Sequence, residues 1–229
     1  MVTDFEFNKA QVIAVTKPVV DFIPDSEGIL SYTARVSSPQ NQDNFETAAG
    51  LLKYCMRNNH WSVFDMCNIV VGVESPRDIL RQVLRHSSIK PQEFSQRYAE
   101  ANNFIVREAR LQDYKNRQNS FNIPEDHPLA VEWRERQAQV LDVVKENYKW
   151  AIDVGIAKEC ARVICPEGNT MSYAYLNGTV RSWITYLNVR DDEGVTQAEH
   201  VDLARKVKQA VTQHFPFLKE VYDKETKND

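Results

Sequence analysis

The sequence of 229 residues is poor in glycine, with seven in all, and it contains neither a G-x-x-x-x-G-K-[ST] nor a G-x-G-x-x-G pattern. P-loops and Rossmann turns depend on those glycines, so neither type of phosphate site is predicted. No apolar run approaches the length of a membrane span, and the first residues lack the basic and apolar regions of a secretory signal. We therefore expect no signal peptide and no contact with a membrane.

Cysteine is also scarce, and no two of the four cysteines form a C-x-x-C pair. Zinc sites need closely spaced thiolates or imidazoles, so no metal site is predicted. Cys55 and Cys160 fall on apolar helical faces, as free buried thiols do, which indicates a reducing compartment. Cys165 has no histidine or aspartate at a spacing typical of a catalytic thiol, and it is interpreted as a packing residue.

The remaining composition is that of an ordinary globular protein, with 42% hydrophobic and 26% charged residues. The length predicts one domain, residues 1–229, with a charged tail at about 222–229 that is predicted to be disordered. The net charge of −4 argues against general binding to nucleic acid, because a phosphate-binding surface needs an excess of basic groups. No nucleic-acid partner is therefore expected.

Hydrophobic periodicity predicts a mixture of strands and helices. Strands are predicted at 11–16, 67–73 and 103–106. Helices are predicted at 44–57, from Ser75 onward, and over 127–152, 156–164, 177–190 and 196–214. The polar segments 17–43, 107–127 and 167–176 are predicted to be loops, and the second of them to be mobile or a frayed helix.

The helix that starts near Ser75 is predicted to present polar groups on one face. Ser75 would cap it, and Pro76 would occupy a first position where a missing N–H costs nothing. Gln82, Arg85 and His86 lie three or four residues apart, so they share a face of the helix.

A cluster of cations follows on this acidic chain. Beyond Pro91 the hydrophobic period changes to two, so Glu93, Ser95 and Arg97 are predicted to point one way from an extended segment. A guanidinium group holds phosphate through two hydrogen bonds, and a serine hydroxyl adds a donor. The cluster therefore favours an anionic ligand over the alternative, a solvated basic face with one salt bridge to Glu93.

Arg85-His86, followed by Gln-Glu-Phe-Ser-Gln-Arg-Tyr at 92–98, closely resembles the flavin-dependent thymidylate synthases of the ThyX type. The motif of that family is Arg-His-Arg, seven residues and a serine; here Ser87 replaces the second arginine. A second stretch is similar to the family as well, with Arg-Ser-Trp-Ile at 181–184, Arg190, and Thr-Gln-x-Glu-His at 196–200. The resemblance covers about residues 30–210.

The resemblance implies an α+β fold with a central, mostly antiparallel sheet flanked by helices, in a homotetramer whose sites are shared between subunits. It implies conversion of dUMP to dTMP, with 5,10-methylenetetrahydrofolate as the one-carbon donor and FAD, reduced by NADPH, as the hydride source. The expected partners are thus dUMP, folate and copies of the same chain. The expected location is the cytoplasm of a bacterium or of a phage-infected host.

The resemblance also implies roles for individual residues. Arg190 would be catalytic, lying on the uracil and favouring its ionised form. The contacts to dUMP would come from Gln82, Arg85, Glu93, Ser95, Gln96 through its backbone, Arg97, Arg162 of a neighbouring subunit, and Arg190. The contacts to FAD would come from His60, Ser62, Arg85, His86, Ser87, Glu93, Thr179, Arg181 and Thr185.

Two departures from the family pattern keep alternatives open. Ser87 removes a cation beside the flavin and folate, and Thr185 stands where members usually have histidine or asparagine. Lys90 is a candidate replacement for the lost charge. One alternative is a related dUMP-modifying enzyme, such as a hydroxymethylase, in which water intercepts the one-carbon unit before the hydride arrives. The other is a catalytically inactive nucleotide-binding homologue.

Overall fold

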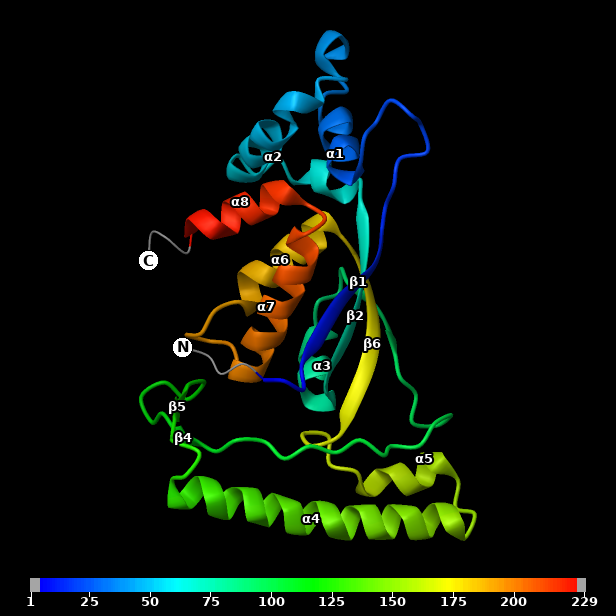
Figure 1. Ribbon diagram of the computed structural model, residues 1–229, viewed down its shortest axis with the longest axis vertical. Helices are drawn as coiled ribbons and strands as arrows, with labels where there is room; N and C mark the ends of the chain where they lie inside the picture. Colours follow the sequence, from blue (N-terminus) through cyan, green and yellow to red (C-terminus); the bar gives the residue numbers. More distant parts are fainter. Residues whose placement is uncertain (1–4, 226–229) are drawn as a thin grey trace.

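The computed structural model describes residues 5–225, and its centre is a four-stranded antiparallel sheet in the order β1-β2-β6-β3 (Figure 1). The strands are β1 (Lys9–Val15), β2 (Asn68–Pro76), β3 (Lys90–Glu93) and β6 (Met171–Thr179). The two central strands, β2 and β6, pair along their whole length, from Asn68 opposite Thr179 to Pro76 opposite Met171. The predicted α+β class with an antiparallel sheet is confirmed.

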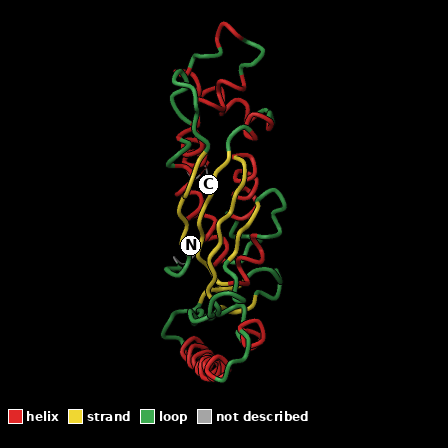
Figure 2. Tube along the Cα trace, turned by 90° about the vertical axis from the view of Figure 1, so that its right-hand side faces the viewer, coloured by secondary structure: helices red, strands yellow, loops and turns green. Residues whose placement is uncertain are grey.

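Three helices cover one face of this sheet: α3 (Arg77–Val83), α6 (Val180–Arg190) and α7 (Ala198–Thr212). Ala174 and Leu176 of β6 face them and are buried, whereas Tyr173 and Tyr175 alternate to the other face and are partly exposed. Figure 2 views the sheet from this open side, with the helices behind it. The main core therefore lies between the sheet and one layer of helices.

Beyond one end of the sheet, a group of helices extends that core. Phe64 and Phe217, both fully buried, stack there with ring centroids 5.7 Å apart. The elements are α1 (Ser26–Ala34), η1 (Pro39–Asn41), η2 (Phe45–Thr47), α2 (Ala48–Arg57), η3 (Trp61–Asp65) and α8 (Pro216–Glu225). Helix α8 was not predicted, and it occupies part of the tail expected to be disordered; residues 226–229 of that tail lie outside the described residues.

At the other end lie α4 (Pro128–Asp153), α5 (Lys158–Ala161), η4 (Arg162–Ile164) and a hairpin of β4 (Arg110–Gln112) and β5 (Ser120–Asn122). The long helix was predicted almost to its bounds, and Gly155, with φ of +85°, follows its end as expected. Its buried side is formed by Ala130, Gln137, Leu141, Tyr148 and Ala151. Leu129 and Trp133 of this helix remain about half exposed.

Other local predictions were also wrong. Segment 17–43 contains α1, whose first turn is capped by Asp25 through the Gly28 amide at 2.7 Å. The polar stretch 167–176 was predicted to be a loop, but it contains most of β6. The alternating tyrosines of this strand line the open face of the sheet. Segment 107–127 is loop and turn as predicted, except for the short strands of the β4–β5 hairpin.

The cap predicted for α3 is likewise different. Ser75 is still part of β2, and its hydroxyl donates to Asn8 Oδ1 at 2.6 Å inside the core. Pro76 therefore takes the cap position, one residue earlier than its predicted role inside the helix. Over residues 5–225, no helix combines the length and hydrophobicity that crossing a membrane requires.

Candidate functional site

Helix α6 is the element along which the predicted functional residues are arranged. Near its end, Arg190 Nε donates to His86 Nε2 at 2.9 Å, and near its start, Ser182 Oγ donates to the Ser88 carbonyl at 3.4 Å. The segment 85–88 therefore runs alongside the helix, which is about 16 Å long at 1.5 Å per residue. The two sequence stretches that carry the family resemblance thus meet along one helix.

The Arg190–His86 contact, at the end of α6, defines the charge state of His86. Because His86 Nε2 accepts from a guanidinium, the imidazole is neutral and carries its proton on Nδ1. Burial lowers the pKa of His86, and the charges of Arg190 and Arg85 lower it further. Arg85 and Arg190 are therefore held close to His86, which has no carboxylate partner within residues 5–225. This arrangement suits a ligand with delocalised negative charge.

Gln82, at the end of α3, is tied to the start of α7. Its Nε2 donates to Gln197 Oε1 at 2.8 Å, and its Oε1 lies 3.2 Å from His200 Nδ1. The Thr-Gln-x-Glu-His stretch at 196–200 therefore supports a predicted nucleotide contact. Sequence reasoning assigned no role to Gln197 or His200, although their motif had been noted.

A second set of predicted nucleotide contacts lies around the edge strand β3. Glu93 forms an ion pair with Arg77 at 3.2 Å and accepts from Ser172 Oγ at 3.1 Å. The predicted extended run ends there, because residues 96–98 form a turn in which Ser95 Oγ accepts from the Arg97 amide at 3.3 Å. Ser95 and Arg97 therefore do not share a strand face with Glu93.

That turn packs beside α5. The exposed Arg97 donates from Nε to Glu159 Oε2 at 2.8 Å, and Arg162 follows Glu159 by three residues. Gln96 is buried, and its Nε2 has no hydrogen-bond partner among residues 5–225. The structure thus brings Arg97 and the segment of Arg162 to one surface, apart from the Gln82–His86–Arg190 group.

The predicted flavin contacts gather at the start of α6. Thr179 caps this helix by accepting from the Ser182 amide at 3.2 Å, and it donates to Asp65 Oδ1 at 3.1 Å. The other oxygen of Asp65 pairs with Arg181 at 3.1 Å, and Thr185 donates to the Arg181 carbonyl one turn later. Asp65 was not among the predicted flavin contacts.

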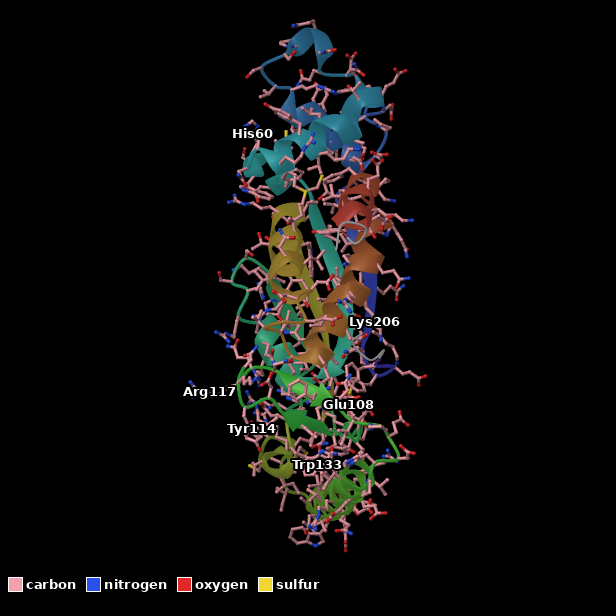
Figure 3. All side chains as sticks on the ribbon, turned by 90° about the vertical axis from the view of Figure 1, so that its left-hand side faces the viewer. His60, Glu108, Tyr114, Arg117, Trp133 and Lys206 are labelled. Carbon is pink, nitrogen blue, oxygen red and sulfur yellow. The ribbon has the colours of Figure 1, made fainter. Side chains whose placement is uncertain are left out.

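His60 and Ser62 belong to the same short segment as Asp65, and both are exposed. The His60 ring packs edge-on against Tyr54 with centroids 5.9 Å apart. Figure 3 places His60 near the end of the molecule opposite Trp133 of α4. The predicted flavin contact His60 and the α4 region therefore lie at different ends of a single chain.

A buried network of ion pairs surrounds Glu199, the residue that precedes His200. Glu199, almost fully buried, receives Arg110 at 2.7 Å and Arg107 at 2.6 Å, and Arg107 also reaches Asp78 at 2.7 Å. Burial by itself would raise the pKa of Glu199, but the two guanidinium groups outweigh it and leave the pKa lowered. Sequence reasoning missed these residues, because the partners of Glu199 come from a segment interpreted as a loop.

A cavity of about 520 Å³ adjoins this network, between the hairpin, α4 and the start of α7. Its lining includes Trp133, Gln197 and Glu199, and Figure 3 shows Trp133 and Glu108 in this part of the molecule. None of the predicted contact residues lines it.

The sequence of the chain is similar to those of known proteins. The family model described as thymidylate synthase complementing protein matches residues 18–217. A probable flavin-dependent thymidylate synthase of Paramecium bursaria Chlorella virus 1 is 44% identical over 216 residues, covering 93% of this chain and 98% of the relative. A flavin-dependent thymidylate synthase of Synechocystis sp. is also 44% identical, over 89% of this chain and 94% of the relative.

Among solved structures, the UMP/dUMP methylase PolB of Streptomyces cacaoi, bound with 5-Br UMP, superposes with a TM-score of 0.75. The match covers 94% of this chain and 93% of that one at 24% identity, so it is evidence of a shared fold. The chain belongs to the thymidylate synthase complementing protein family. Within it, the resemblance to the flavin-dependent thymidylate synthases is confirmed by the two relatives at 44% identity.

Proposed function

We propose that this chain makes dTMP from dUMP by reductive methylation, with Arg190 as the catalytic residue. The observation that carries the proposal is the Arg190–His86 hydrogen bond of 2.9 Å, which joins the two motif stretches at one point. Membership of the family supports FAD as the cofactor, and NADPH and 5,10-methylenetetrahydrofolate as co-substrates.

The chemistry explains why an arginine serves here. Carbon 5 of uracil is a weak nucleophile, and it attacks the one-carbon unit only when electron density is pushed into the ring. A guanidinium group stays protonated, so Arg190 stabilises negative charge on the pyrimidine and does not act as a base. His86, as a neutral acceptor, holds that guanidinium in a fixed direction without neutralising it.

The groups at the start of α6 offer a flavin an exposed polar surface. Arg181 is half exposed while Asp65 balances its charge, and Ser62 and Ser87 are exposed hydroxyls on the neighbouring segments. His60, Thr179 and Thr185 would complete this surface. When bound and reduced, FAD supplies the hydride; the residues of the chain orient the ring and exclude water.

Ser87 is compatible with this surface. Lys90 Nζ donates to the Ser87 carbonyl at 2.6 Å, so a cation lies next to the position of the missing arginine. We assign Lys90 the role of that arginine in attracting anionic groups. A Lys90→Gln variant with unchanged FAD affinity would contradict this assignment.

The distribution of the site favours an assembly with shared sites. Gln82, Arg85 and Arg190 form one group, while Arg97 and Arg162 belong to another surface, which supports a dUMP site completed by a second chain. Apolar side chains on α4, including Leu129, Trp133, Val140, Val143 and Trp150, are about half exposed and available for burial between copies. We expect a homotetramer of 26.5 kDa chains, and light scattering that gave one chain's mass would contradict it.

The hydroxymethylase alternative stays tied to Ser87, since a displaced folate or flavin would expose the one-carbon intermediate to water. The inactive homologue predicts dUMP binding without turnover.

A cytoplasmic location is part of the proposal, supported by free thiols at Cys55 and Cys67; oxidation of these two to a disulfide in the native protein would contradict it.

The Arg97→Ala variant is expected to bind dUMP about 10- to 150-fold more weakly, a loss of about 1.5–3 kcal/mol for one charge-assisted phosphate contact. In the structure Arg97 is exposed and pairs with Glu159, so its guanidinium is available to a phosphate. Calorimetric titration of dUMP measures the loss. Arg136→Ala, which removes another exposed ion-paired arginine, is the matched control, and equal affinities in both variants would refute the phosphate role.

A further inference from the structure

His200 is a buried residue that the proposed mechanism leaves unused. It lies in the first turn of α7, with no exposed surface, and its ring packs on Tyr186 with centroids 5.8 Å apart. Burial, followed by the charge of Arg190, lowers its pKa to about 3. The imidazole is therefore neutral in working conditions and has a single N–H to donate.

The position of that proton follows from its surroundings. His200 Nδ1 lies 3.2 Å from Gln82 Oε1, whereas Nε2 is buried with no partner among the described residues. A proton on Nε2 would leave a buried donor without an acceptor, and it would require the Gln82 and Gln197 amides both to turn over. A proton on Nδ1 completes a hydrogen bond to Gln82 Oε1 with the amides as they stand.

The Gln82 amide is consequently held at both ends. Its oxygen faces the fully buried His200, and its nitrogen donates one hydrogen to Gln197 Oε1 at 2.8 Å. Gln197 is half-buried whereas His200 has no exposed surface, so the nitrogen end is the one on the accessible side. The group that Gln82 has left to offer a ligand is its second N–H, a donor.

We infer that His200 is a positioning residue that, together with Gln197, fixes the Gln82 amide with a donor facing the base, and so selects uracil against cytosine. The inference rests on the proposed function, since it places Gln82 at the pyrimidine. A donor matches the ring carbonyl of uracil and opposes the amino group that cytosine carries at the same place. An amide free to turn would accept either base.

The test measures binding of dUMP and dCMP by calorimetric titration of the FAD-loaded protein. In His200→Phe, the ring volume stays and the N–H is lost, so we expect the preference for dUMP over dCMP to fall about tenfold, with weaker dUMP binding and gained dCMP binding. His200→Asn, which keeps an N–H donor, is expected to recover part of the preference. His214→Phe, the same change at an exposed histidine just beyond α7, is expected to leave it unchanged.

If His200 had a purely structural role, His200→Phe would weaken the binding of dUMP and of dCMP alike. An unaltered preference for dUMP in folded His200→Phe overturns the inference. If that variant does not fold, Gln197→Met removes the other contact at a half-buried position, and an unaltered preference there has the same meaning. If the unmodified protein binds neither nucleotide, the proposed function fails as well. If the unmodified protein binds dUMP and the variants keep its preference for dUMP over dCMP, the proposed function stands and the inference about His200 fails.

Discussion

Arg190→Ala is expected to lose turnover by about 10²- to 10³-fold or more while the fold is retained. In the proposed mechanism the guanidinium is the fixed cation that stabilises the ionised pyrimidine, and in the structure its Nε donates to His86 at 2.9 Å. Because Arg190 ends α6 and is only partly buried, alanine at this position removes little core packing. The measurement is kcat for dTMP formation, with the melting temperature as the check on folding.

Arg190→Lys is the matched variant, because it keeps the charge but loses the planar fork of donors. We expect it to retain dUMP binding better than alanine and still to turn over poorly, since one ammonium cannot donate to His86 and lie flat against a ring at once. Turnover in Arg190→Ala at the rate of the unmodified protein would remove the catalytic assignment.

The largest effect on stability is expected from Glu199→Ala. Glu199 is almost fully buried and neutralises both Arg107 and Arg110, so its loss leaves two guanidinium groups in the interior with less compensation. Removing one partner of a buried ion pair costs about 3–5 kcal/mol of unfolding free energy. Denaturant unfolding at neutral pH measures the change.

Glu74→Ala is the control, because the Lys9–Glu74 pair of 2.9 Å has a largely exposed lysine. A surface pair of this kind contributes about 0–1 kcal/mol, so this variant is expected to unfold almost like the parent. Similar losses in the two variants would show that the buried network does not bear the stability assigned to it.

The sequence predicted the parts of the fold that depend on strong local periodicity. The long helix from Pro128, the strand that became β2 and the helix ending at Arg190 each carry enough apolar residues at one spacing to be recognised. Strand β6 was missed because its outward residues, Tyr173 and Tyr175, face an open side of the sheet and blur the alternation. Its role as the central strand is decided by pairing with β2, which local sequence does not encode.

The candidate site shows the same division. Gln82, Arg85, His86 and Arg190 were identified by the family motif, and the structure joins three of them to one another or to neighbouring elements through hydrogen bonds. Their supporting residues were not foreseen, since the contact of Gln82 with His200 spans 118 positions in the chain. Such contacts arise because the end of α3 lies beside the start of α7, and they follow no spacing rule.

The predicted strand face of Glu93, Ser95 and Arg97 failed for a related reason. Period two continued in the sequence, but β3 ends at Glu93 and the chain turns at residues 96–98 toward α5. The partner strand does not set this end, because β6 extends three residues past the partner of Glu93, to Met171, and the chain leaves the sheet at the turn instead. The motif residues therefore stay predicted contacts, while their predicted local geometry was wrong.

The central claim is tested most directly by the mass of the product. The protein would be incubated without oxygen with FAD, NADPH, dUMP and 5,10-methylenetetrahydrofolate, and the nucleotide analysed by mass spectrometry. The account predicts a nucleotide of the mass of dTMP, with Ser87 a tolerated change in the motif. A hydroxymethyl nucleotide, or unchanged dUMP in a protein that binds both FAD and dUMP, would contradict it.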